Sequence, residues 1–193
     1  MKLLRTIRLD ASDGFVFERA AAAGEWAVPG GFEFWSADPA GLNGRERQAF
    51  RAGFLGLSSF AWSTLVVAVT VTPEEKAVAI ESLAQYLMRV HGAPDHAHAI
   101  AAATHEIAYA ESLAGHPEGT LIALHRTLDA EGNVRELFRT LRPADARDAA
   151  QMPCSAGAFA IIEDETTIRD GAGDEIDLMA LAAAADRSEV PRP

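Results

Sequence analysis

The sequence predicts an α+β fold with a mainly antiparallel sheet and two long helices packed on one face. Two helical patterns, 73–91 and 95–114, lie between groups of strand-like segments in which apolar residues alternate or run continuously. The stretch from Phe15 to Trp62 holds all three tryptophans and seven of the nine phenylalanines, so it is expected to fill the space between the layers. The expected strands are residues 2–9, 15–18, 25–35, 63–71, 120–128 and 134–141.

The first strands are predicted from short apolar patterns. Residues 2–9 alternate, and 15–18 resume as a strand after a turn composition at 10–14. Residues 25–35 are expected to form a hairpin around Pro29-Gly30-Gly31. A period of two in its second strand places Phe32 and Phe34 on one face and Glu33 on the other.

A short helix and a buried strand follow. Asn43 precedes a helical pattern over 44–53, and Gly53 and Gly56 are candidates for a left-handed terminating position. Residues 64–71 are almost continuously apolar or β-branched, which is typical of a strand buried on both faces.

Both long helices have clear start signals. Thr72, Pro73 and Glu75 have the spacing of a capping box, and Asp95 is a suitable cap for the second helix. Gly92 and Gly115, each with a proline two residues later, mark the two ends. The helices are expected to pack as an antiparallel pair, with these residues facing inward: Ala77, Ile80, Ala84, Leu87, Ile100, Ala103, Ile107, Ala110 and Ala114.

The next two segments predict a strand pair with a defined register. Residues 120–128 and 134–141 flank the turn 129–133. If Leu128 opposes Val134, Arg126 lies opposite Glu136 on one face and His125 lies opposite Leu137 on the other.

The chain changes character at Pro143. Residues 1–142 carry a net charge of −4 and are expected to form a single domain, whereas 143–193 carry −7 and are expected to form a partly ordered acidic appendage. A strand at 159–162 and a short helix at 174–186 are its expected elements.

Bulk composition excludes several functional classes. The net charge of −11 argues against binding nucleic acid or an anionic membrane surface. A single cysteine, Cys154, forms no internal disulfide, and neither a signal peptide nor a membrane-spanning run is present. We therefore expect a cytoplasmic protein.

The titratable residues form no recognisable catalytic motif. The helical His96, His98 and His105 lack the spacing of three or four that a metal site requires, so no metal and no cofactor are expected. His125 is a candidate general base without a matching nucleophile, and Cys154 is expected to be inert. One cationic row is either an anion site or a partner for the acidic tail: Arg126, Arg135, Arg139 and Arg142.

Several segments together resemble a known family. The segments are 4–10, 15–20, 24–28, 50–56, His125-Arg126 and 138–140. They resemble a small group of uncharacterised bacterial proteins classed as a domain of unknown function, over about residues 1–142. Because that family has no assigned activity, the resemblance implies no catalytic residue.

Two functional hypotheses remain at this point. The first is a non-enzymatic binding or accessory protein that engages a protein partner or a second copy of itself through the aromatic stretch, with Trp26 and Trp35 as anchors. The alternative is a small-molecule enzyme or ligand-binding domain with a pocket beside the sheet, formed by Glu33, His125, Arg126 and Arg139.

Overall fold

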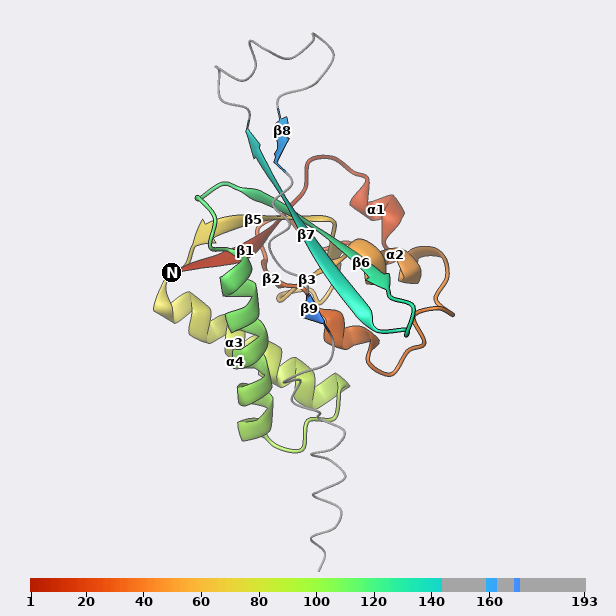
Figure 1. Cartoon of the computed structure of the whole chain (residues 1–193). Coiled ribbons are helices and arrows are strands. Elements are labelled where there is room, and N and C mark those ends of the chain that lie inside the picture. The colour runs from red at the N-terminus through yellow and green to blue at the C-terminus, as the bar shows by residue number, and fades with distance from the viewer. Residues whose placement is uncertain (144–158, 163–168, 171–193) are drawn as a thin grey trace, which may run out of the picture.

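The computed structural model describes residues 1–143, 159–162 and 169–170, and these form an antiparallel sheet covered by helices (Figure 1). The strand order is β4-β3-β2-β1-β5-β6-β7-β8, and β9 also pairs with β7. This arrangement confirms the predicted α+β class. The strands are β1 (Lys2–Ile7), β2 (Trp26–Val28), β3 (Phe54–Gly56), β4 (Trp62–Ser63), β5 (Leu65–Thr70), β6 (Leu121–Leu128), β7 (Val134–Pro143), β8 (Phe159–Ile162) and β9 (Arg169–Asp170). The helices are α1 (Asp13–Val16), the 3-10 helix η1 (Gly31–Phe34), α2 (Gly44–Ala52), α3 (Pro73–Val90) and α4 (His96–Leu113).

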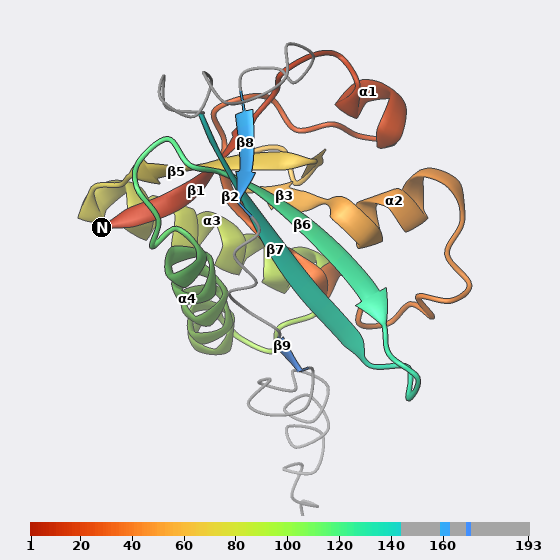
Figure 2. The ribbon, with the colours of Figure 1, turned by 45° about the horizontal axis from the view of Figure 1, so that its top comes forward.

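The two long helices begin where the sequence predicts. The Thr72 side chain accepts the Glu75 N–H at 3.1 Å, and the Glu75 carboxylate accepts the Thr72 N–H at 3.0 Å, which completes the capping box. Asp95 caps α4 by accepting the His98 N–H at 2.9 Å. Both helices lie on the same side of the sheet, where their axes cross (Figure 2). None of the helices in the described residues is both long and apolar enough to cross a bilayer.

The inward faces of α3 and α4 form the main core with the sheet. Leu83, Ala84 and Ile107 are fully buried in this core, together with Leu4 of β1. The predicted face is only partly correct. Ala77 is exposed, and Ile80 and Ile100 are half-buried, because the face that contacts the sheet is centred on Leu83 rather than on Ile80.

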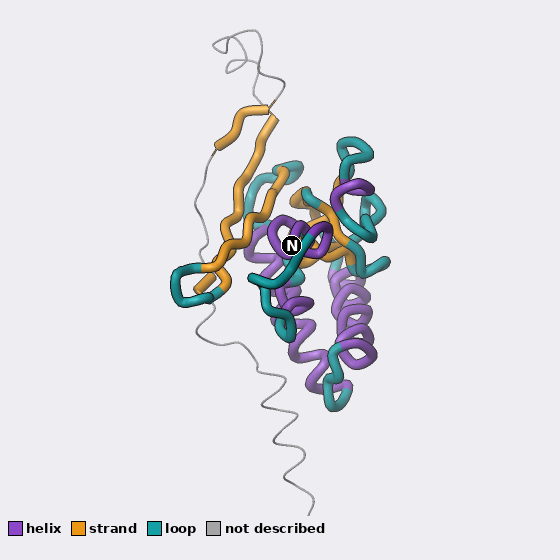
Figure 3. Tube along the Cα trace, turned by 90° about the vertical axis from the view of Figure 1, so that its right-hand side faces the viewer, coloured by secondary structure: helices purple, strands orange, loops and turns teal. Residues whose placement is uncertain are grey.

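The strand pair has the predicted register. Leu128 lies opposite Val134, Arg126 opposite Glu136, and His125 opposite Leu137. Figure 3 shows β6 and β7 as a long ribbon beside the helical layer. The edge of β7 that faces away from β6 pairs with β8 and β9, and Ile162 of β8 lies opposite Thr140. The expected helix at 174–186 lies outside the described residues.

Two predicted strands of the aromatic stretch are wrong. The segment predicted as a strand at 15–18 includes the end of α1, with Phe15 77% exposed and Phe17 completely buried. The second half of the expected hairpin is the 3-10 helix η1, which follows Gly30 with its left-handed φ of 71°. In place of that strand, β2 pairs with β1 and β3. Phe32 and Phe34 are nevertheless both buried, because in η1 the two side chains enter different clusters of the core.

Glycine is required at positions 53 and 56 because neighbouring atoms lie too close to leave room for a Cβ atom. The expected left-handed backbone is not the reason. Gly53 is extended, with φ of −94°, and a Cβ atom there would lie 2.6 Å from the Ala49 carbonyl oxygen. A Cβ at Gly56 would lie 2.7 Å from a carboxylate oxygen of Glu25. Both glycines therefore allow β3 to lie against its neighbours.

The strand β5 is fully buried on only one face. Val66 and Ala68 are completely buried, whereas Leu65 and Val67 on the other face are half-buried. The less buried face lies beside Arg5 of β1, which pairs with Val67. The continuous apolar run thus correctly predicts a strand but overstates its burial.

Candidate functional site

A pocket of about 340 Å³ lies where η1, α4 and the β6–β7 turn meet. Its volume falls within the range of small-molecule sites, roughly 300–1,000 Å³. Segments far apart in sequence form it, and most lining positions come from 31–39, 102–106 and 132–136. Among the residues that the structure describes, the lining comprises Gly31, Phe32, Phe34, Trp35, Ala37, Pro39, Phe50, Leu87, Ala102, His105, Glu106, Arg126, Gly132, Asn133, Val134 and Glu136.

Aromatic rings form one wall of the pocket. Phe32, Phe34 and Phe50 are each less than 10% exposed, whereas Trp35 is 46% exposed. Phe34 meets Phe50 edge to face with ring centroids 5.3 Å apart and stacks on Trp62 at 5.4 Å. Phe32 contacts Trp35 in the same edge-to-face manner at 6.2 Å. These contacts hold three rings in fixed positions and leave Trp35 accessible.

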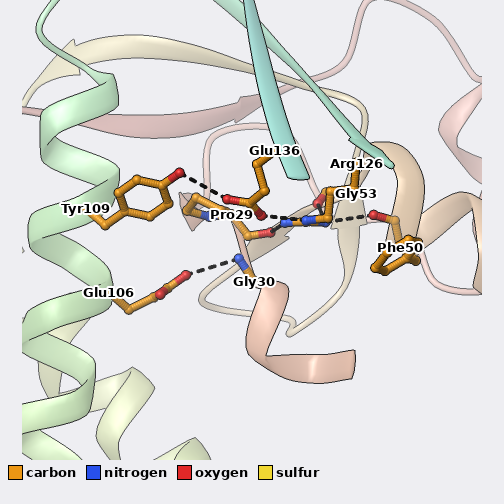
Figure 4. A network of polar contacts seen from close by, with 8 residues as sticks. All are labelled: Pro29, Gly30, Phe50, Gly53, Glu106, Tyr109, Arg126 and Glu136. Carbon is orange, nitrogen blue, oxygen red and sulfur yellow. Dashed lines mark hydrogen bonds and ion pairs between the residues drawn. The ribbon is translucent and has the colours of Figure 1, made fainter. Parts of the chain in front are cut away.

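The polar floor of the pocket is a buried ion pair. The Arg126 Nε donates to Glu136 Oε1 at 2.6 Å, and the Arg126 side chain is completely buried (Figure 4). The other Glu136 oxygen accepts the Tyr109 hydroxyl at 3.0 Å. Burial of such a pair is costly unless further hydrogen bonds satisfy both groups, and here they do.

The Arg126 guanidinium also binds the backbone of two other segments. Its Nη1 donates to the carbonyls of Phe50 and Gly53 at 2.9 and 3.2 Å, and Nη2 donates to the Pro29 carbonyl. Phe50 lies in the last turn of α2, where carbonyls lack helical partners. Arg126 therefore caps α2 and ties it to the end of β2, as Figure 4 shows.

Glu106 places a second carboxylate at the pocket. It extends from α4 and accepts the Gly30 N–H at 3.2 Å, which links the helix to the start of η1 (Figure 4). Gly31 lies directly over the ion pair, and a Cβ atom there would be 3.4 Å from Glu136 Oε1. The absence of a side chain at Gly31 thus lets η1 approach the pocket floor.

Two of the six predicted binding residues line this pocket, namely Trp35 and Arg126. Trp26 is half-buried elsewhere, with the Arg5 guanidinium 4.1 Å from its ring centroid. Glu33 is bonded to His91 Nε2 at 3.0 Å and does not line the pocket.

His125 and Arg139 lie on the opposite face of the β6–β7 pair from Arg126. His125 is next to Arg126 in β6, and Arg139 lies opposite Ala123 of the same strand. Because side chains alternate between the two faces along a strand, those of His125 and Arg139 lie on the face opposite to that of Arg126. The structure therefore does not assemble the expected pocket of Glu33, His125, Arg126 and Arg139. Burial, together with the charges of Arg51 and Arg139, lowers the pKa of His125 below its ordinary value.

Tyr86 of α3, which lies beside Glu33 of η1, is another residue with a shifted pKa. Burial raises the pKa of Tyr86 above its ordinary value, and the neighbouring Glu33 carboxylate raises it further. Tyr86 stacks on Phe60 at 3.8 Å and meets His91 at 5.6 Å. Together with the His91–Glu33 pair, these contacts link Glu33 of η1 to α3.

The helical histidines bind nearby carboxylates. His96 lies 3.1 Å from Glu81, and His98 lies 2.8 Å from Asp95. In the part of the chain that the structure describes, no group of three or more His, Cys, Asp or Glu residues could hold a metal ion. His105 lines the pocket, which spacing arguments alone did not indicate. Cys154 lies outside the described residues.

Sequence reasoning also did not single out most of the other lining residues, among them Phe34, Phe50, Glu106 and Asn133. The two phenylalanines belong to the aromatic stretch, which marked the correct region but not the pocket. The position of Glu106 depends on its contact with Gly30, 76 residues away, and no local pattern predicts such a contact.

The model of a family of unknown function, DUF6505, matches residues 1–155. The chain belongs to this family. The match confirms the predicted resemblance over about 1–142, and all residues that line the pocket fall within the DUF6505 region. No curated protein and no solved structure matched the chain.

Proposed function

We propose that this DUF6505 member is a non-enzymatic cytoplasmic binding protein that takes an apolar group of its ligand into the aromatic pocket. One observation carries the proposal. Rings from the aromatic stretch form a pocket wall, and one of them, Trp35, is held by Phe32 while remaining 46% exposed. An accessible tryptophan beside a pocket is a typical anchor for a ligand or partner.

The ion pair at the floor of the pocket supports binding over catalysis. A general acid or base needs a group that can exchange a proton with the substrate. Arg126 is directed at Glu136 and at three backbone carbonyls, and Glu136 bonds both Arg126 and Tyr109. These groups stabilise the walls, and His125 lies on the other face of the sheet.

The test is a comparison of what co-purifies with three tagged forms of the full chain from an extract of the native host. These forms are the wild type, Trp35→Ala and Phe15→Ala. Phe15 is the matched control because it is an exposed aromatic of the same stretch that does not line the pocket. Mass spectrometry of both protein and small-molecule fractions identifies what is retained.

We expect one ligand to be retained by the wild type and by Phe15→Ala, and lost with Trp35→Ala. Circular dichroism verifies that all three forms are folded. Equal retention by Trp35→Ala and the wild type would show that the pocket does not mediate binding. Loss with Phe15→Ala alone would move the binding surface to α1.

A further inference from the structure

The face of the β6–β7 pair that lies away from Arg126 carries a cluster of basic side chains. His125 lies opposite Leu137 and Arg139 lies opposite Ala123, so His125 and Arg139 are diagonal neighbours on this face. Diagonal neighbours in an antiparallel pair are about 7–8 Å apart, which is within reach of a long side chain. The register therefore brings the Arg139 guanidinium close to the His125 imidazole.

The end of α2 adds a second arginine to the same place. Arg126 of β6 donates to the carbonyls of Phe50 and Gly53 at 2.9 and 3.2 Å. Arg51 lies between these two anchored residues, so the end of α2 holds it beside β6. Burial lowers the pKa of His125, and the positive charge of Arg51 lowers it further, which agrees with this placement.

No carboxylate pairs with this cluster in the part of the chain that the structure describes. Arg51 and Arg139 are exposed, His125 is half-buried, and none of the three has an ion pair there. Arg135, the next arginine on this face, differs because it lies 3.4 Å from Asp129. Like charges held together repel one another, and an anion that binds between them relieves the repulsion.

We infer that Arg51, His125 and Arg139 form a binding site for a small oxyanion, namely phosphate or the phosphate group of a small molecule. Guanidinium groups match pairs of phosphate oxygens, and a protonated imidazole donates a further hydrogen bond. A phosphate group carries nearly two negative charges at neutral pH, so two arginines attract it more strongly than a single carboxylate. None of the three residues lines the aromatic pocket, and the two sites are therefore separate.

The chain itself supplies a rival anion for this cluster. Along β7, β8 ends opposite Thr140 and β9 begins opposite Glu136, on either side of Arg139. The sequence between β8 and β9 begins with three acidic residues, 163–165. Because a guanidinium binds carboxylates and phosphates with the same bidentate geometry, the experiment has to distinguish the two sources.

NMR titration of the His125 imidazole in the isotope-labelled full chain tests the inference. The pKa of His125 is measured with inorganic phosphate and, separately, with chloride at the same ionic strength. A His125→Gln sample assigns the signal among the six histidines. We expect phosphate to raise the pKa of His125 by about 0.5 or more beyond the chloride value, because a bound anion favours the protonated imidazole. The chloride control removes the contribution of simple screening between the arginines and the imidazole.

Two variants and a matched control locate the response. Arg139→Gln and Arg51→Gln should each remove most of the phosphate-dependent rise in the pKa of His125. Arg135→Gln should retain the rise, because that arginine lies on the same face but pairs with Asp129. Circular dichroism verifies that every variant is folded. A rise that persists in both Arg139→Gln and Arg51→Gln, or that is lost equally in Arg135→Gln, would overturn the site.

A triple variant, Glu163→Gln/Asp164→Asn/Glu165→Gln, separates the two sources of anion. If the site takes phosphate, this variant should keep the pKa of His125 measured without phosphate and the rise with phosphate. If the wild type shows no rise beyond chloride, the inference is overturned. A lower pKa of His125 in the triple variant would in that case assign the cluster to the acidic residues of the chain itself.

Discussion

The buried Arg126 guanidinium is predicted to contribute more to stability than any exposed ion pair of the hairpin. Arg126→Met leaves the Glu136 charge buried without its partner, and loss of one partner of a buried pair costs about 3–5 kcal/mol. It also removes hydrogen bonds to the carbonyls of Pro29, Phe50 and Gly53, each worth about 1 kcal/mol. The expected loss is therefore at least about 4 kcal/mol, a large share of the 5–15 kcal/mol typical of a domain.

Urea unfolding followed by circular dichroism measures this loss. With a slope of about 2 kcal/mol per molar urea, the midpoint should fall by about 2 M. Arg135→Met is the matched control, because Arg135 lies on the same hairpin and its ion pair with Asp129, at 3.4 Å, is exposed on the arginine side. That control should cost about 1 kcal/mol or less.

The double variant Arg126→Met/Glu136→Gln separates the ion pair from the backbone contacts. It removes both charges and keeps an acceptor for the Tyr109 hydroxyl. If the three backbone hydrogen bonds contribute as argued, the free energy of unfolding of the double variant stays about 3 kcal/mol below that of the wild type. Recovery of wild-type stability, or an Arg126→Met cost no larger than that of Arg135→Met, would refute the role of Arg126 as a cap for α2.

Three further predictions concern stability. Gly30→Ala should lower the free energy of unfolding, measured in urea, more than Gly44→Ala does. Both glycines have positive φ, but only a Cβ at Gly30 would lie within 2.7 Å of a side-chain atom of β3. Equal losses in the two variants would contradict the clash. Thr72→Ala should cost about 1 kcal/mol through loss of the α3 cap, whereas Thr72→Ser should retain most of the stability. The lowered pKa of His125 means that the unfolded chain binds more protons just below pH 6.5, so stability should fall as the pH drops through this range. His125→Gln should flatten that limb of the stability curve and Arg51→Gln should reduce its slope, whereas an unchanged curve in both would exclude His125 as its source.

The elements that sequence reasoning predicted correctly are those whose signals are local. The capping box at Thr72 and Glu75 is specified within four residues, and its geometry is the predicted one. The β6–β7 register follows from a short turn and from alternation, which together fix every opposing pair. A slip of one residue would have exposed Phe138 and Leu124, which are 4% exposed.

The errors arise where local patterns fit two conformations. Phe32-Glu33-Phe34 satisfies strand alternation, yet the same three side chains reach two core clusters and His91 from a 3-10 turn. The strands β3 and β4 have three and two residues, too few for any periodicity to detect. Their positions depend on the pairing of β3 with β2 and of β4 with β3, which is a tertiary property.

The candidate site was only partly predictable for the same reason. Trp35 and Arg126 could be singled out by residue type, because an aromatic cluster and a mid-strand arginine are unusual in themselves. His105 stands out only as a possible metal ligand, which its spacing excludes, and Glu106 has the pattern of an ordinary polar position on α4. Their place in the pocket is set by how α4 crosses the sheet beside η1.

The arginines of the hairpin appear in the sequence as one cationic row, but the parity of the strand divides them into two environments. Arg126 faces the core, where Glu136 neutralises its charge and backbone carbonyls accept its other N–H groups. Arg139 faces outward with His125, where the lowered pKa of the imidazole reflects its burial and the positive charges of Arg51 and Arg139. The two faces of the β6–β7 pair thus differ: one holds the buried Arg126–Glu136 pair, and the other holds Arg139 together with His125.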